Sequence, residues 1–111
     1  MELNVKQRVV LLGTLAGMTS NATELRILRE LREALSFTEE EHALYGIRTE
    51  TTGDGRELMF WESGAGTKEV EIGDVARRII VRQLKALNEQ NALADDHLDI
   101  LDLFPEVEEG R

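Results

Sequence analysis

The chain contains no cysteine and only one proline, and aromatic residues make up 5% of its 111 residues. The absence of cysteine excludes disulfides, thiolate metal sites and cysteine nucleophiles. Long apolar runs are missing as well. The run from Val9 to Leu12 stops at Gly13, far short of the roughly 18 residues that span a bilayer, and it is too short for a signal peptide. We therefore expect a cytoplasmic protein that does not enter a membrane.

The composition that remains fits a globular protein, with 41% hydrophobic and 32% charged residues. A length of 111 residues is typical of a single domain. We expect one domain over residues 1–105, followed by a frayed acidic tail over residues 106–111.

Charge is unevenly spread along the chain, whose net charge is -9. Residues 74–85 hold four basic residues and one acidic residue, whereas residues 86–111 hold one basic residue and eight acidic ones. A strongly acidic protein is repelled by phosphate backbones. Direct binding to nucleic acid is therefore not expected.

Helical periodicity marks the N-terminal third of the chain. It predicts three helices, over Val5–Ala16, Thr23–Leu35 and Glu39–Tyr45. The apolar stripe of the first is expected on Val5, Val9, Leu12 and Ala16, widened by Val10 and Leu11. Its N-cap is expected at Asn4, and the sequence leaves open whether Ser20, Asn21 or Thr23 caps the second.

The third helix has clear signals at both ends. Thr38 and Glu41 have the spacing of a capping box, and Gly46 suits the C-terminal cap. The middle of the chain then changes to β-rich runs. Runs over residues 47–52 and 56–62 lie on either side of an Asp-Gly pair, which predicts a hairpin. Residues 68–72 alternate as a third short strand.

Two more helices are expected towards the C-terminus. The first runs from Val75 to about Gln90 with a broad apolar face made of Val75, Ala76, Ile79, Ile80, Val81, Leu84 and Leu87. The second runs from Asp95 to Phe104, with Leu98, Leu101 and Phe104 facing inward, and Pro105 stops it. The expected fold class is α+β: three N-terminal helices, a small antiparallel hairpin or three-stranded sheet, then a long and a short helix. This order of elements is also that of a winged-helix protein.

No catalytic motif is present. The sequence has neither a nucleophile elbow nor a phosphate-binding loop that opens a helix. A zinc site would need His42 and His97 to meet in space with an acidic residue, and a solvated position is the favoured interpretation for both. We therefore expect no enzyme activity, no cofactor and no metal.

Three surface features are candidates for binding a partner. A basic face on the long helix would contact an anionic partner and consists of Arg77, Arg78, Arg82 and Lys85. An acidic stripe would imitate a phosphate backbone if the last helix is continuous, and consists of Asp95, Asp99, Asp102 and Glu106. For both sets, a merely solvated helix face is the favoured alternative. Trp61 is the third candidate, because an exposed tryptophan often lies in an interface.

Several segments resemble a known group of proteins. Residues 3–8, 28–42 and 71–74 are similar to a family of small bacteriophage and prophage proteins with no assigned activity. The similarity covers most of the chain in the same order, including residues 93–104, and departs at residues 17–21 and in the hairpin. It implies a phage origin and assigns no site residue.

Three functions follow as hypotheses. The first is a phage-encoded accessory protein that binds and inhibits a host protein, such as a defence nuclease or a transcription component, in the bacterial cytoplasm. The second is a winged-helix-like DNA-binding regulator, although the recognition helix would be Glu39–Tyr45, which carries three glutamates and no basic residue. The third is a virion assembly component, which would form homo-oligomers.

Overall fold

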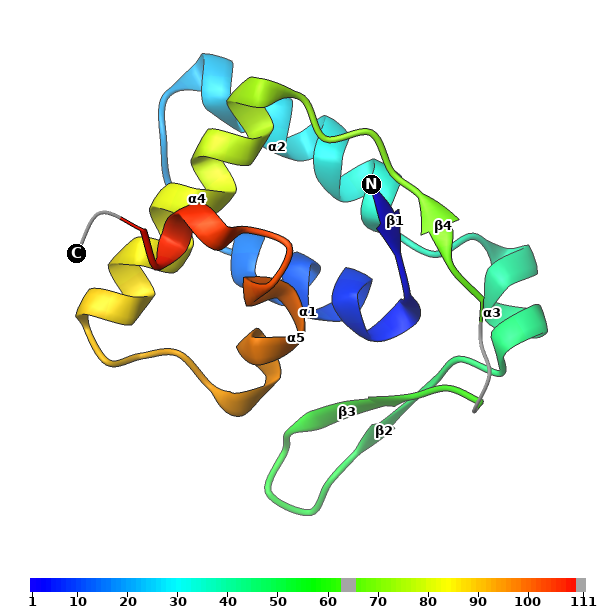
Figure 1. The fold of residues 1–111 in the computed structure, drawn as a ribbon. Coiled ribbons are helices and arrows are strands. Elements are labelled where there is room, and N and C mark those ends of the chain that lie inside the picture. Colours follow the sequence, from blue (N-terminus) through cyan, green and yellow to red (C-terminus); the bar gives the residue numbers. More distant parts are fainter. Residues whose placement is uncertain (63–65, 110–111) are drawn as a thin grey trace.

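The computed structural model describes residues 1–62 and 66–109 (Figure 1). Its α-helices are α1 (Val5–Leu15), α2 (Ala22–Leu35), α3 (Glu39–Tyr45), α4 (Asp74–Glu89) and α5 (Leu98–Leu101). Its strands are β1 (Glu2–Leu3), β2 (Arg48–Thr51), β3 (Glu57–Phe60) and β4 (Lys68–Glu69). Two 3-10 helices, η1 (Asp95–His97) and η2 (Pro105–Val107), lie near the C-terminus. The expected α+β fold class is confirmed.

Side-chain caps start the first three helices as their sequences predict. The Asn4 side chain accepts a hydrogen bond from the Gln7 amide at 2.8 Å, and the Asn4 amide donates to the Gln7 side chain. Asn21 is the cap of α2 and accepts from the Glu24 amide. Thr38 caps α3, with the reciprocal bond to Glu41 that completes a capping box.

Helix α1 is central to the molecule and packs against α2, α4 and α5 (Figure 1). The core lies between these helices and includes Leu3 of β1 and Val70, the residue after β4. It is formed by Leu3, Leu11, Leu15, Leu28, Leu31, Leu35, Val70, Ala76, Ile79, Ile80, Leu84, Ile100, Leu101, Phe104 and Val107. Within the expected apolar face of α4, Val75 is an exception, because 39% of it is exposed in the first turn.

The buried face of α1 differs from the expected one. Its buried residues are Val5, Arg8, Leu11, Thr14 and Leu15. Of the predicted stripe, Val5 and Leu11 are buried, Val9, Val10 and Leu12 are half-buried, and Ala16 is exposed. The prediction was therefore correct only in part, because the inward face also includes Arg8 and Thr14.

The strands form two separate two-stranded sheets. β2 and β3 are antiparallel neighbours in the expected hairpin, with Arg48 opposite Phe60 and Thr51 opposite Glu57. β4 pairs with β1 at the N-terminus and not with the hairpin, so the three-stranded alternative is wrong. The N-terminal amino group of Met1 adds to this pairing by donating to the Val70 carbonyl at 3.0 Å. β4 therefore pairs with a strand that lies at least 65 residues earlier in the sequence, since Lys68 pairs with Leu3.

The hairpin turns through three residues. Thr52 donates its amide to the Arg56 carbonyl at 2.8 Å, and Gly55 donates to the Thr52 carbonyl at 3.0 Å. Gly55 has φ of 84°, which suits the left-handed residue of a bulged three-residue turn. The two strands project away from the helices (Figure 1), and all eight of their residues are exposed.

The C-terminal segment is more broken than expected. Instead of one helix to Phe104, it contains η1, the short α5 and a turn before η2. Leu98 is therefore 61% exposed, while Ile100 is fully buried. The turn after α5 brings both Phe104 and Val107 into the core. The expected frayed tail from residue 106 is thus wrong at its start, and residues 110–111 lie outside the described part of the chain.

The order of elements does not produce a winged-helix core. In the described residues, α3 buries none of its side chains, whereas a helix-turn-helix core depends on mutual packing of its helices. α1 is covered instead by α4 and α5, which follow the hairpin. Over the same part of the chain, no helix combines the length and apolar character needed to cross a bilayer.

Candidate partner-binding site

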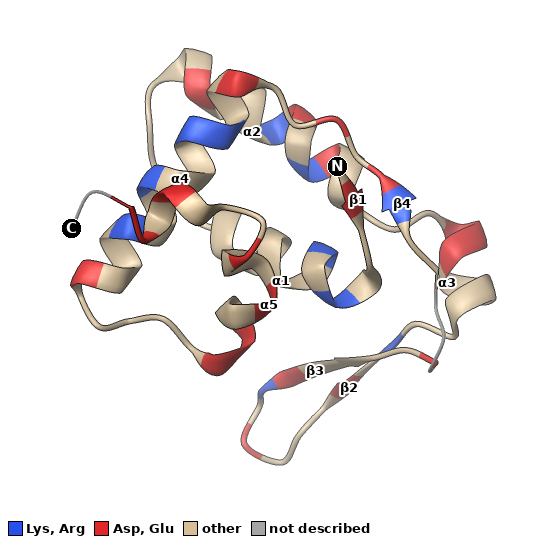
Figure 2. Ribbon diagram, viewed as in Figure 1, with Lys and Arg blue, Asp and Glu red and all other residues tan. Residues whose placement is uncertain are grey.

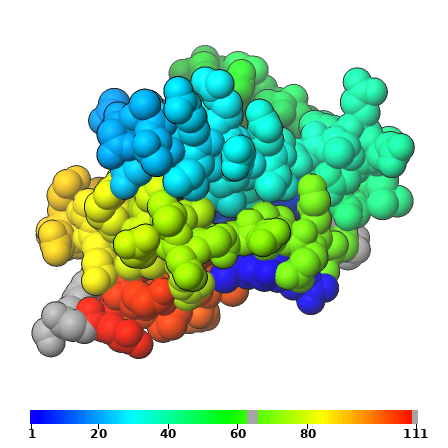
Figure 3. All heavy atoms as spheres, turned by 90° about the horizontal axis from the view of Figure 1, so that it is seen from above, coloured from blue at the N-terminus to red at the C-terminus, as the bar shows by residue number. Residues whose placement is uncertain are grey.

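A groove of about 400 Å³ lies between α2 and the start of α4. In Figure 3 it is the furrow between the cyan helix and the lime segment that leads into α4. Five of its lining residues have apolar side chains, which are Ile27, Leu31, Ala34, Val75 and Ala76. The groove exists because α2 and α4 are in contact further along, while the chain enters α4 through Gly73, which has no side chain to fill the space.

Carboxylates surround this apolar floor. Glu30 of α2, Glu71 before α4 and Asp74 at the first turn of α4 line the groove, and all three are exposed. Figure 2 shows the acidic positions on the segment that enters α4. None of the described lining residues is Lys or Arg. Within the described chain, no basic group forms a salt bridge with these three carboxylates. The groove therefore combines apolar surface with carboxylates that form no salt bridge in the described part of the chain.

The predicted basic face is partly consumed by internal ion pairs. The Arg77 guanidinium binds both carboxylate oxygens of Glu106, at 2.5 and 2.8 Å, and lies 4.9 Å from the Phe104 ring centre. Arg82 binds Glu24 of α2 at 2.7 Å. These contacts lower the pKa values of Glu24 and Glu106 to about 2. Arg78 and Lys85 remain exposed on α4.

The predicted acidic stripe is not a continuous helix face. Asp95 lies in η1, Asp99 in α5 and Asp102 just beyond it, while Glu106 lies in η2. Lys6 of α1 binds Asp99 at 2.9 Å and thereby neutralises part of the set. Glu106 is occupied by Arg77, as described above. The stripe required one helix through residue 106, and the chain instead turns at residues 102–103 to bury Phe104.

Trp61 follows β3 directly and is half-buried. The exposed apolar surface lies on the three residues before it. Leu58, Met59 and Phe60 are 39%, 36% and 36% exposed. Arg48 of β2 lies over the Phe60 ring, 5.3 Å from its centre. The strand therefore presents the apolar surface that the sequence had suggested for the tryptophan.

Arg8 is the charged residue that the sequence interpretation missed. Its side chain is only 1% exposed. Nη1 binds Glu41 at 2.6 Å, Nη2 donates to the Ser36 carbonyl at 2.7 Å, and Nε donates to the Leu35 carbonyl at 3.1 Å. The guanidinium also lies 4.0 Å from the ring centre of Phe37. Arg8 lies three residues after Val5 and three residues before Leu11, and this helical spacing indicated that it shares their buried face.

The ion pair with Arg8 changes the pKa of the Glu41 carboxyl group. The Arg8 guanidinium is the main cause that lowers the pKa of Glu41 to about 2, and the Thr38 amide contributes to the shift. All three guanidinium nitrogen atoms of Arg8 donate to oxygen atoms of α2, α3 or the link between them. The cluster joins helices and has no group left free for a ligand.

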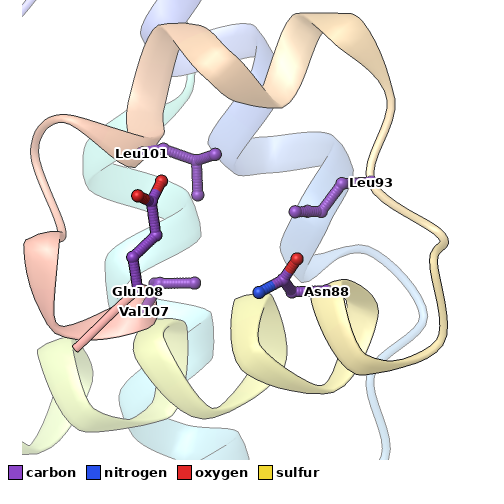
Figure 4. A pocket seen from close by; sticks show the side chains of 5 residues that line it. All are labelled: Asn88, Leu93, Leu101, Val107 and Glu108. Carbon is purple, nitrogen blue, oxygen red and sulfur yellow. The ribbon is translucent and has the colours of Figure 1, made fainter. Parts of the chain in front are cut away.

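A smaller hollow of about 250 Å³ lies between the end of α4 and the C-terminal segment. Figure 4 shows the side chains of Leu93, Leu101 and Val107 around it, together with the Asn88 carboxamide and the Glu108 carboxylate. Its one carboxylate belongs to no group of three or more potential metal ligands among the described residues.

The two histidines do not meet in a metal site. The described residues contain no group of three or more His, Asp or Glu side chains that could hold a metal ion. His97 accepts the Ala94 amide on Nδ1 at 2.8 Å. His42 packs edge-on against Phe37, with ring centres 6.3 Å apart. Both imidazoles therefore have local structural contacts.

No family model, curated protein or solved structure matches the chain. The resemblance to phage proteins therefore stays a prediction. The proposed function is therefore based on the surfaces described above.

Proposed function

We propose that the protein is a non-enzymatic accessory protein that binds a partner protein through the groove between α2 and α4. The observation that carries this proposal is the apolar floor bordered by the unpaired carboxylates of Glu30, Glu71 and Asp74. Apolar surface supplies affinity when it is covered, and complementary charge directs the encounter and selects the partner. The partner segment should therefore carry apolar side chains flanked by Lys or Arg.

The proposed partner is a host protein, in keeping with the resemblance to phage proteins. Nucleases and transcription components bind nucleic acid through basic surfaces. An acidic protein with a net charge of -9 is attracted to such surfaces and would compete with the nucleic acid. We therefore propose inhibition of a nucleic-acid-binding host protein, in the bacterial cytoplasm, as the biological role.

The test compares three forms of the tagged chain in a pull-down from bacterial lysate. The groove variant is E30K/E71K, and the control is E33K/E40K, which makes the same change of charge at exposed positions of α2 and α3. We expect the wild type and the control to retain the same stoichiometric host protein. The groove variant should bind it at least about ten-fold more weakly, a change that corresponds to about 1.4 kcal/mol.

Two outcomes would contradict the groove as the binding site. Equal retention by all three forms would exclude it, and equal loss from both variants would show that only overall charge matters. Recovery of the tagged chain alone would favour the virion alternative, and the lysate of infected cells would be examined next. A gel shift at low salt checks the DNA-binding alternative, which the acidic surface of α3 disfavours.

A further inference from the structure

Among the described residues, no strand pairs with the outer edge of β3 in the hairpin's two-stranded sheet. A two-stranded hairpin is marginally stable by itself and gains stability from a third strand or a covering layer. All residues of β2 and β3 are exposed, and Leu58, Met59 and Phe60 each keep more than a third of their surface open to solvent. None of these strand residues belongs to the core of the protein.

The direction of the backbone groups at this edge follows from the register. Thr52 donates its amide to Arg56, and inward and outward groups alternate along an antiparallel strand. Leu58 and Phe60 therefore direct their amides and carbonyls towards β2. The amides and carbonyls of Glu57 and Met59 face the free edge.

We propose that β3 pairs antiparallel with β3 of a second copy of this chain, around a two-fold axis at Leu58. Glu57 of each copy then lies opposite Met59 of the other, and each such pair exchanges two backbone hydrogen bonds. Leu58 lies opposite its own counterpart. The two hairpins become one four-stranded sheet.

The residue chemistry favours this register over its neighbours. An axis at Glu57 would place two carboxylates opposite each other, which is destabilising. An axis at Met59 would require Trp61 to pair with Glu57, although Trp61 lies beyond the strand and is half-buried. With the axis at Leu58, Arg56 lies opposite Phe60 of the second copy, a cation–π arrangement.

The two edges of the hairpin differ in a way that selects β3. Natural edge strands avoid association through charged side chains, lysine above all, through proline or through a bulge. Residues 57–60 contain one charged residue, Glu57, and no lysine, proline or bulge, whereas β2 contains both Arg48 and Glu50. The β2 edge instead presents Thr49 and Thr51, flanked by charged residues. In Figure 1 the hairpin lies at the bottom of the view, while α2 and the start of α4, whose residues line the groove, lie at the top. Pairing at β3 therefore leaves the groove open and is independent of the proposed function.

Solution mass tests the proposal with a matched pair of proline variants. Met59→Pro removes an amide that faces the β3 edge, and Thr49→Pro removes the equivalent amide at the β2 edge, so neither breaks the ladder between β2 and β3. By sedimentation equilibrium, we expect the wild type and Thr49→Pro to dimerise. Met59→Pro should be at least about ten-fold weaker in association, while its thermal unfolding should match that of Thr49→Pro at a protein concentration low enough for both to be monomeric.

Cysteine cross-linking tests the register in a chain with no native cysteine. Leu58 would lie in a non-hydrogen-bonded pair with Cα atoms about 4.5 Å apart, within the range for a disulfide. Met59 would lie diagonally from its counterpart, about 7–8 Å away, beyond that range. Under mild oxidation we expect Leu58→Cys to form dimers at least about ten-fold faster than Met59→Cys.

Three results would overturn the proposal. They are a wild type that stays monomeric up to about 1 mM, a dimer that Met59→Pro and Thr49→Pro weaken equally, and faster cross-linking at residue 59 than at residue 58.

Discussion

Arg8 shows how one buried side chain connects three parts of the chain. The carbonyls at the end of a helix lack partners within the helix, and Arg8 satisfies those of Leu35 and Ser36 at the end of α2. The same guanidinium binds Glu41, which also belongs to the capping box of α3. The position of α3 relative to α1 therefore depends on this one residue of α1.

At this scale we expect Arg8→Met to lower the free energy of unfolding by about 3–5 kcal/mol, because it leaves a half-buried carboxylate and two carbonyls without their partner. Urea denaturation followed by circular dichroism measures the change. Arg78→Met is the matched control at an exposed position of α4 and should change the free energy by less than about 0.5 kcal/mol.

Arg8→Lys separates charge from geometry in the same assay. An ammonium group cannot form the forked contacts of a guanidinium, so it should restore only part of the lost stability. If Arg8→Met and Arg78→Met unfold at the same urea concentration, Arg8 does not hold the helices together.

Among the elements, the hairpin is the least integrated into the core. None of its strand residues is buried, whereas Ile47, just before β2, is only 8% exposed. The short α5 shows the opposite behaviour, since Ile100 and Leu101 are both buried. The contribution of an element to the core therefore depends on how many of its side chains point inward, and not on its length.

This difference predicts that the hairpin is dispensable for folding. Arg48 and Phe60 are directly opposite each other, so residues 49–59 are replaceable by Asn-Gly, which closes a two-residue turn. We expect the shortened chain to unfold cooperatively, with a melting temperature within about 4–8 °C of the wild type, a shift that corresponds to about 1 kcal/mol. Calorimetry measures it, and loss of cooperative unfolding would show that the core needs the hairpin.

For the whole molecule, ion pairs of three arginines are among those that connect distant segments. Arg8 binds Glu41, Arg82 binds Glu24, and Arg77 binds Glu106. Arg82 thereby joins α4 to the start of α2, and Arg77 joins α4 to η2. Basic residues that the sequence suggested for an anionic partner thus hold the protein's own acidic groups.

The pH dependence of stability follows from these three carboxylates. The pKa of each is lowered from 4.5 to about 2 in the folded protein, mainly by its arginine. A carboxyl group with a lowered folded-state pKa stabilises the fold above its unfolded pKa and loses that contribution on acidification. We expect the free energy of unfolding to fall as pH decreases from about 4.5 towards 2.

Urea titrations at several pH values measure this dependence. Glu41→Gln is the informative variant, because it removes the most buried of the three carboxylates. Its stability should change less between pH 5 and pH 2.5 than that of the wild type. An identical pH profile would mean that Glu41 does not contribute through its charge.

The sequence by itself determined the local features of this protein. The caps at Asn4 and Thr38, the left-handed Gly46 and the turn before Arg56 were all predicted correctly. Each depends on hydrogen bonds or backbone angles within about four neighbouring residues, whose identities are visible together in the sequence. The helix of residues 74–89 was equally clear, because its apolar residues recur over several turns.

Only the tertiary structure decided the features that join distant segments. Arg8 turned inward because Glu41 and the end of α2 were there to receive it, and β4 found its partner at the N-terminus. The last helix ended early because a turn allowed Phe104 to enter the core. The residues next to Arg8, β4 or the last helix do not indicate which distant residues will contact them. Burial of a charge, choice of a strand neighbour and the point where a helix stops depend on free energies supplied by residues far along the chain.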